Sequence, residues 1–160
     1  MRMKRIFIIM LIFVLMTPSL SFAEVQKSYD GDKVDAKSVL LDLEIIKDYK
    51  DDFIINADTF GKSLTRITGS GDYALKFFKN VDAGKNLSYG DVLTVLLDLT
   101  GYAPDVLIKS NLDRSGSVTA TAKKAGISKG VSCRYDDKVL MSDYVQLIYN
   151  ALTVDMQRQV

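Results

Sequence analysis

Few side chains in this sequence could carry out covalent or metal chemistry. The 160 residues contain no His and one Cys, Cys133, which removes the commonest general base, the usual zinc ligands and an internal disulfide. Asp48, Asp51 and Asp52 form a cluster in which one carboxyl could act as acid and another as base. Nothing apolar in this Lys-containing stretch would keep a carboxyl protonated, so we expect a solvated loop. We therefore predict no catalytic residue, no cofactor and no enzyme activity, with carboxylate catalysis the one route left open.

Residues 111–118 resemble the start of a calcium-binding loop of the EF-hand or dockerin type. Oxygen-bearing side chains occupy positions 1, 3 and 5, with Gly at 6 and an apolar residue at 8. Ala122 stands at position 12, where a carboxylate should complete the shell, and Arg114 lies inside the loop. We therefore predict a polar turn ahead of a helix and no metal site. Calcium-dependent docking remains a third functional hypothesis.

The charge distribution disfavours nucleic acid as a partner. The chain has 21 Lys and Arg against 20 Asp and Glu, and Arg2, Lys4 and Arg5 precede the first acid, Glu24. Without residues 1–23 the chain is slightly acidic, so it has no excess positive field to attract phosphates.

Residues 1–23 are typical of a secretory signal peptide. A basic start precedes an apolar run over residues 6–16, and Ser21 and Ala23 supply small residues at positions −3 and −1 of a cleavage site. The run is too short for a bilayer core, which needs about 20 residues. We expect a secreted protein with a flexible leader at 24–33 and no membrane span after cleavage. An uncleaved N-terminal anchor is the alternative.

The mature chain shows helical periodicity of apolar residues. Strong helices are predicted at 57–68, 89–100 and 142–152, and weak ones at 35–43, 72–78 and 118–124. Residues 45–46 and 53–55 look β-like, but each stretch is short enough to be a buried loop anchor. The sequence thus predicts an all-α domain over residues 34–155. A weak–loop–strong unit recurs three times, at about 34–69, 70–102 and 116–153, which is typical of a repeat architecture.

The order and spacing of these segments resemble the S-layer homology family. Its repeat has a first helix, a stretch like G-I-x-x-G-Y-x-D-x-x-F, and an I-T-R-A-E-F box that opens a second helix. The resemblance covers about residues 34–155 and implies three helix–loop–helix repeats around a pseudo-threefold central bundle. The corresponding segments here are EIIKDYKDDFIINADTFGKSLTRITG at 44–69, NLSYGDVLTVLLDLTGY at 86–102, AKKAGISKGV at 122–131 and VLMSDYVQLIYNALT at 139–153.

The box also predicts how the strong helices begin. Ser88 and Asp91 have the spacing of a capping box, in which each side chain bonds the other residue's amide. Asn56 is a good N-cap for the first strong helix. Leu140 cannot cap the third, so we expect Ser142 to cap it one turn later.

The family's box Arg implies a ligand, because it helps to bind an anionic cell-wall polysaccharide beside a helix N-terminus. Ala57, Tyr89 and Met141 occupy the matching positions here. Anion recognition would then fall to loop cations, aided by the partial positive charge of the helix ends. The candidate cations are Lys47, Lys50, Lys129 and Arg134, with Tyr49 and Tyr89 as stacking faces.

Two function classes follow from the resemblance. The first is a secreted, non-enzymatic module that associates with the cell wall or cell surface through its polysaccharide. The second is a structural or interaction domain that has lost polysaccharide binding and whose partner is an envelope protein. The oligomeric state is left open.

Overall fold

The structure is a computed structural model that describes residues 35–102 and 114–156. Within these ranges the chain forms six α-helices and no β-strand, only isolated bridge residues, which confirms the all-α prediction. The predicted signal peptide and leader, and residues 111–113 of the calcium-like stretch, lie outside the described ranges. The helices are α3 (Ala36–Asp42), α4 (Ala57–Thr68), α5 (Gly71–Phe78), α6 (Tyr89–Leu99), α8 (Arg114–Ala125) and α9 (Met141–Thr153).

Helix α8 is longer than the sequence pattern predicts. It begins at Arg114 rather than Val118, so the expected polar turn over 114–117 is wrong. The buried residues of α8 recur at helical spacing, but half of them carry hydroxyl groups. Ser117 and Thr121 are as buried as Val118 and Ala122. A search for apolar periodicity therefore misses the first turn of this helix.

The caps of the strong helices are partly as predicted. Asn56 accepts a hydrogen bond from the Thr59 amide, and Ser88 and Asp91 form the full capping box. The prediction that Ser142 caps α9 is wrong, because the helix already begins at Met141. Its N-cap position is Leu140, which makes no side-chain cap hydrogen bond.

Three short linkers, residues 53–56, 85–88 and 137–140, precede α4, α6 and α9 and bond to one another in a closed cycle. The Ile55 amide donates to the Val139 carbonyl (2.9 Å), Val139 to Leu87 (3.3 Å) and Leu87 to Ile55 (2.9 Å). We call this arrangement the linker ring. The β-like stretch at 53–55 contributes one isolated bridge residue, Ile54, rather than a strand. Ile55 is a buried anchor as predicted, but Phe53 and Ile54 are exposed, which corrects the prediction for those two residues.

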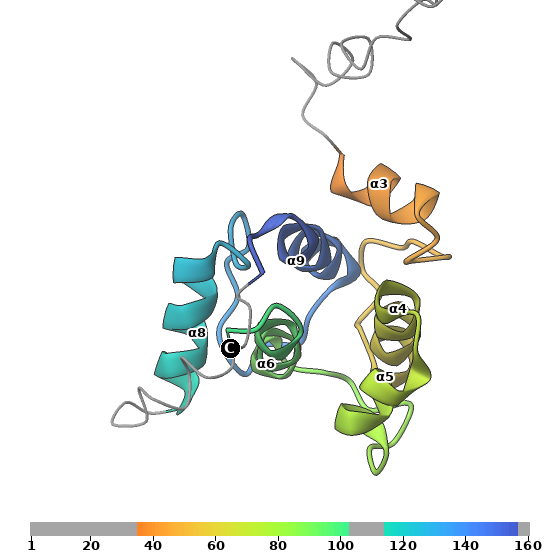
Figure 1. Cartoon of the computed structure of the whole chain (residues 1–160), viewed down its shortest axis with the longest axis horizontal. Coiled ribbons are helices and arrows are strands. Elements are labelled where there is room, and N and C mark those ends of the chain that lie inside the picture. Colours follow the sequence, from red (N-terminus) through yellow and green to blue (C-terminus); the bar gives the residue numbers. More distant parts are fainter. Residues whose placement is uncertain (1–34, 103–113, 157–160) are drawn as a thin grey trace, which may run out of the picture. The chain divides into compact units, whose positions relative to one another are not determined.

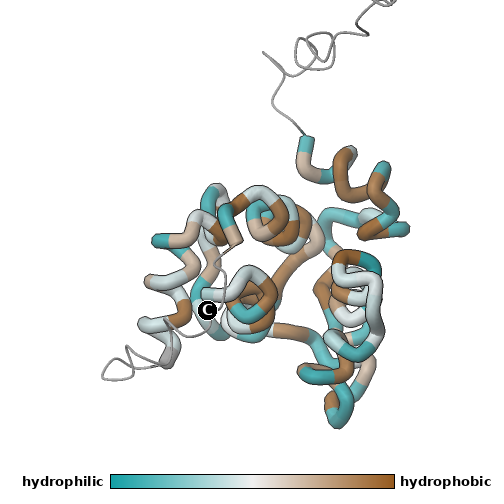
Figure 2. The backbone as a smooth tube through the Cα atoms, in the orientation of Figure 1, coloured by the Kyte–Doolittle hydropathy of each residue, from teal (hydrophilic) through white to brown (hydrophobic). Residues whose placement is uncertain are grey.

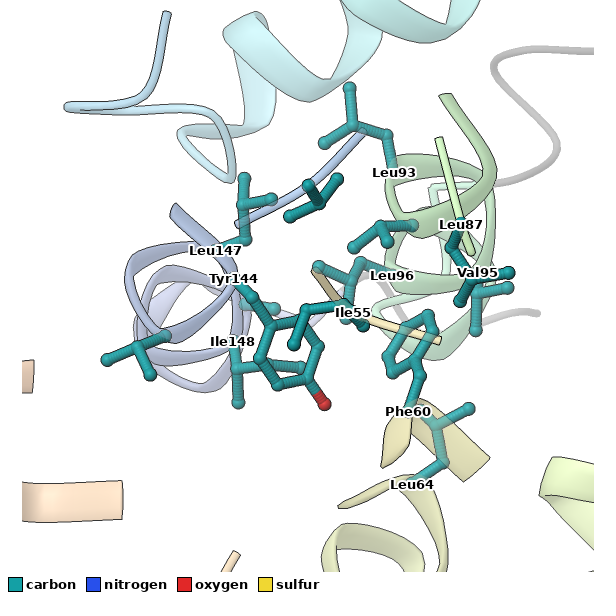
Figure 3. Packing of buried hydrophobic residues seen from close by; sticks show 14 of the residues in the cluster. Ile55, Phe60, Leu64, Leu87, Leu93, Val95, Leu96, Tyr144, Leu147 and Ile148 are labelled. Carbon is teal, nitrogen blue, oxygen red and sulfur yellow. The ribbon is translucent and has the colours of Figure 1, made fainter. Parts of the chain in front are cut away.

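The core fills the space between α4, α6 and α9. Figure 3 shows Ile55 at its centre, with Leu96 of α6 on one side and Tyr144 of α9 on the other. The Tyr144 ring meets Phe60 of α4 edge-on, with centroids 5.6 Å apart, a favourable aromatic geometry. Figure 2 shows that hydrophobic residues extend from these helices into the linkers. The broad apolar faces therefore bring the three predicted strong helices together.

The six helices pack in three pairs. α5 packs on α4, α8 on α6, and α3 on α9 (Figure 1). The first helix of the described chain thus pairs with the last. Leu40 of α3 is fully buried.

No helix in the described ranges is both long enough and apolar enough to cross a membrane.

Candidate functional site

A groove lies between the loop that follows α3 and the outer face of α4. It has a volume of about 680 Å³ and brings together three of the predicted site residues, Lys47, Tyr49 and Lys50. Two further cations, Lys62 and Arg66 of α4, line the same groove. We call it the α4 groove. Its remaining lining residues are Ile46, Asp48, Phe53, Asp58, Thr59, Ser63 and Met141.

Helix α4 holds the loop through one backbone carbonyl. Ile45 is buried, and its carbonyl accepts hydrogen bonds from the Ser63 hydroxyl (3.1 Å) and the Arg66 guanidinium (3.0 Å). These two bonds fix the loop that carries Lys47 and Lys50. Arg66 therefore both positions the groove and adds charge to it.

Lys62 and Arg66 are not among the site residues that the sequence predicts. They follow Asp58 at i+4 and i+8, so all three share one exposed face of α4. That spacing marks a solvent-facing stripe, but only the docking of Ile45 places the loop beside it. Lys62 is paired with Asp58 at 2.6 Å, and both side chains are well exposed, so this pair contributes little stability.

The side chain of Tyr49 contacts two neighbours within the protein, Asp51 and Lys37. Its hydroxyl donates to Asp51, and this hydrogen bond raises the pKa of Tyr49 to about 12. The Lys37 ammonium lies over its ring, 4.0 Å from the centroid, as in a cation–π contact. One face of the ring is therefore covered, which restricts its predicted role as a stacking face. Asp51, one member of the acidic cluster, serves as this acceptor.

Tyr89 lies away from the α4 groove and is only 4% exposed. It is the first residue of α6, and burial raises the pKa of its hydroxyl, with Ser128 as a hydrogen-bonding neighbour. A side chain packed this way offers no face to a sugar, so the predicted stacking role of Tyr89 is wrong. The linker ring explains the burial, because it draws the start of α6 into the protein.

Lys129 and Arg134 lie on the loop before α9 and do not line the α4 groove. Asn150 of α9 holds this loop by donating to the carbonyls of Ile127 (2.8 Å) and Lys129 (2.7 Å). The predicted anion-binding residues therefore lie on two separate loops. Only those on the loop after α3 line the α4 groove together.

Cys133, on the same loop, is partly buried, with its sulfur 3.5 Å from a carboxylate oxygen of Asp143. Burial, reinforced by that carboxylate, raises the pKa of the Cys133 thiol to about 11. The thiol is therefore protonated and weakly nucleophilic at neutral pH. Among the described residues, no group of three His, Cys, Asp or Glu side chains is placed to hold a metal ion.

The three positions that the predicted resemblance would align with the box Arg are all buried. Ala57, Tyr89 and Met141 are 3–4% exposed. Their amides donate to linker carbonyls: Ala57 to Lys85 (3.0 Å), Tyr89 to Asp137 (2.8 Å) and Met141 to Phe53 (2.8 Å). The first amide of each strong helix is thus used inside the linker ring. The expected attraction of acidic sugars to these helix ends is correspondingly weakened.

Comparison with protein-family models gave no match, and comparisons with curated proteins and with solved structures gave none.

Proposed function

We propose that this protein is a secreted, non-enzymatic module that binds an anionic polysaccharide of the cell wall in the α4 groove. The observation that carries the proposal is the convergence of Lys47, Lys50, Lys62 and Arg66 on one groove. Only two acids, Asp48 and Asp58, line it with them. An excess of cations along one surface attracts a polyanion without requiring a single dominant contact.

Three features support an S-layer-homology-like repeat architecture for this module. The three linkers form a cycle of hydrogen bonds, and the helices pack in three pairs, with α3 paired to α9. The loops before α4 and α9 are also held in the same way, because Arg66 and Asn150, each nine residues after the start of its helix, bond the carbonyls of Ile45 and Ile127. Two repeats that arose by duplication are expected to make equivalent contacts at equivalent positions.

The binding we propose is weak and depends on salt. Exposed charges at the groove interact through solvent, so their attraction falls as the ionic strength rises above about 0.1 M. Arg66 is the most constrained of the four cations, because its guanidinium also bonds the Ile45 carbonyl.

The test is co-sedimentation of the protein with purified cell wall, before and after its secondary polysaccharide has been stripped. We expect binding at low salt, weaker binding at moderate salt, and loss on stripping. The variant Lys47→Gln with Lys50→Gln should reduce binding by about tenfold or more. Its matched control is Lys123→Gln with Lys124→Gln, which removes the same charge from the exposed end of α8 and should bind as the parent does.

The alternative is an interaction domain that keeps the scaffold and has lost polysaccharide binding. The burial of Ala57, Tyr89 and Met141 at the box positions favours it. Failure to sediment under every condition, with the protein folded, would decide for this alternative.

A further inference from the structure

The three linkers of the ring pair with one another at three bridges, which we call junctions. At one junction the side chains are apolar and exposed. Ile54 and Leu140 form an antiparallel bridge and are 37% and 39% exposed. Phe53, the residue before Ile54, is 39% exposed and lines the α4 groove. We call Phe53, Ile54 and Leu140 the junction patch. Phe53 and Met141, the chain neighbours of Ile54 and Leu140, line the α4 groove, so the patch borders that groove.

The other two junctions of the ring are polar at the corresponding bridges. There Asn56 pairs with Asn86, and Ser88 pairs with Lys138. Every bridge residue outside the Ile54–Leu140 pair can bond water or cap a helix. The apolar pair is therefore not required by the ring, which forms the same bridges with polar residues.

Leu140 also weakens the local structure. Asn56 and Ser88 cap α4 and α6 with a side-chain oxygen, whereas Leu140 leaves α9 without such a cap. A residue that can cap is strongly preferred at this position, whereas Leu140 cannot cap and still leaves 39% of its surface exposed. Local rules of this kind are broken mainly at functional or strained sites.

The surroundings indicate the chemistry of a partner. The groove that borders the patch has a net positive charge, because four cations outnumber the two acids Asp48 and Asp58, of which Asp58 is paired with Lys62. The cations are Lys47, Lys50, Lys62 and Arg66. A ligand that covers both must carry apolar groups for the patch and negative charge for the groove. An acidic polysaccharide has the charge but lacks apolar side chains, so it leaves the patch exposed.

We infer that the junction patch, together with the neighbouring end of the α4 groove, docks an acidic segment of another protein that carries apolar side chains. Its apolar side chains cover Ile54 and Leu140, and its carboxylates approach Lys47 and Lys50. This inference does not depend on wall binding. Occupation of the groove by the segment would exclude the polysaccharide proposed above.

The test measures binding of the full chain to three short synthetic peptides by fluorescence anisotropy. The first contains Asp and Leu residues, the second has Ser in place of each Leu, and the third has Lys in place of each Asp. We expect the first to bind at least about tenfold more tightly than the other two. Equal binding of the first and second would mean that charge alone is recognised, which would overturn the inference.

The variant Ile54→Asn with Leu140→Ser installs the residue types found at the polar junctions, and Ser at 140 restores a capping side chain. It should fold normally by circular dichroism, lose at least about tenfold in affinity for the Asp–Leu peptide, and keep wall binding. Leu75→Ser is the matched control, because Leu75 is an exposed leucine on α5. Two results would overturn the inference. One is unchanged peptide affinity in the double variant. The other is self-association of the parent chain that the double variant abolishes, which would make a second copy the occupant.

Discussion

At the scale of single residues, Glu44 adopts a backbone conformation that favours glycine. Its φ is 54°, and it is the only non-Gly residue with positive φ in the described ranges. It follows the end of α3 and precedes the buried Ile45. In the loop before α9, Gly126 has a φ of 88° and precedes the buried Ile127. A side chain in this left-handed region costs about 1 kcal/mol.

We predict that Glu44→Gly stabilises the protein by about 0.5–1 kcal/mol, since it removes this strain and part of the gain is offset by a more flexible unfolded chain. The measurement is urea unfolding followed by circular dichroism. Glu44→Ala is the control, because it removes the carboxylate and keeps the strain, and its stability should stay within about 0.5 kcal/mol of the parent. An equal gain in both variants would assign the effect to charge instead.

We predict that Cys133 of the folded protein reacts with iodoacetamide at pH 8 about a hundredfold more slowly than the unfolded chain. Burial raises its pKa to about 11, whereas a free thiol has a pKa of about 8.5. The folded state therefore keeps a proton that the unfolded chain releases. The resulting contribution to stability is present below about pH 8.5 and is lost as the pH rises towards 11.

Asp143→Asn tests the cause of this low reactivity. It removes the carboxylate 3.5 Å from the sulfur and should raise the native alkylation rate without changing the rate in denaturant. Equal native and denatured rates in the parent chain would contradict the shift.

At the scale of helices, two glycines in helical positions have opposite surroundings. A Cβ added at Gly90 of α6 would lie 2.4–2.6 Å from ring atoms of Tyr135, whereas nothing lies within 4 Å of one added at Gly116 of α8. The Gly90 amide also donates to the Tyr135 carbonyl (2.8 Å). Gly90 thus permits the loop before α9 to lie against the start of α6.

We predict that Gly90→Ala destabilises the protein by about 1–3 kcal/mol, because the Tyr135 ring must move away. Gly116→Ala should stabilise it by about 0.8 kcal/mol, the usual difference in helix propensity. Thermal unfolding of both variants checks the pair. Adding Tyr135→Ala to Gly90→Ala should recover most of the loss, and a failure to recover it would show that the ring is not responsible.

The sequence predicts elements better where burial and apolar character coincide. The broad apolar faces of α4 and α6 gave their starts at Ala57 and Tyr89 correctly. The first turn of α8 escaped prediction because Ser117 and Thr121 are buried hydroxyl residues. At the site, the sequence grouped Lys47, Tyr49 and Lys50 through their shared loop. It could not show that Tyr89 faces inward, because the partners that bury it come from a distant loop.

At the scale of the whole molecule, the linker ring joins three distant parts of the chain. Ile55, Leu87 and Val139 each donate to and accept from another member of the ring, and all three are buried. Opening any one linker removes a hydrogen bond from both of the others. The ring should therefore behave as one cooperative unit rather than as three separable linkers.

We predict that the amide protons of Ile55, Leu87 and Val139 exchange with the same free energy, equal to that of global unfolding. Native-state hydrogen exchange followed by NMR across a urea series measures this directly. The amide of Lys129, an exposed residue in the loop before α9, bonds only within a local turn, to the Gly126 carbonyl (3.2 Å). It serves as a reference for local opening and should exchange faster. Clearly different free energies for the three ring amides would mean that the linkers open independently.

The closed cycle also limits when this protein can acquire its native structure. The carbonyl that Ile55 requires belongs to Val139, and the surface on which α3 packs belongs to α9. Contacts between such distant parts of a chain form slowly, because a large loop must close before they stabilise anything. During synthesis the first helices must wait for the linker that precedes α9 before the ring can close. The growing chain therefore stays open until α9 has been made, and a chain truncated before α9 leaves the ring unclosed.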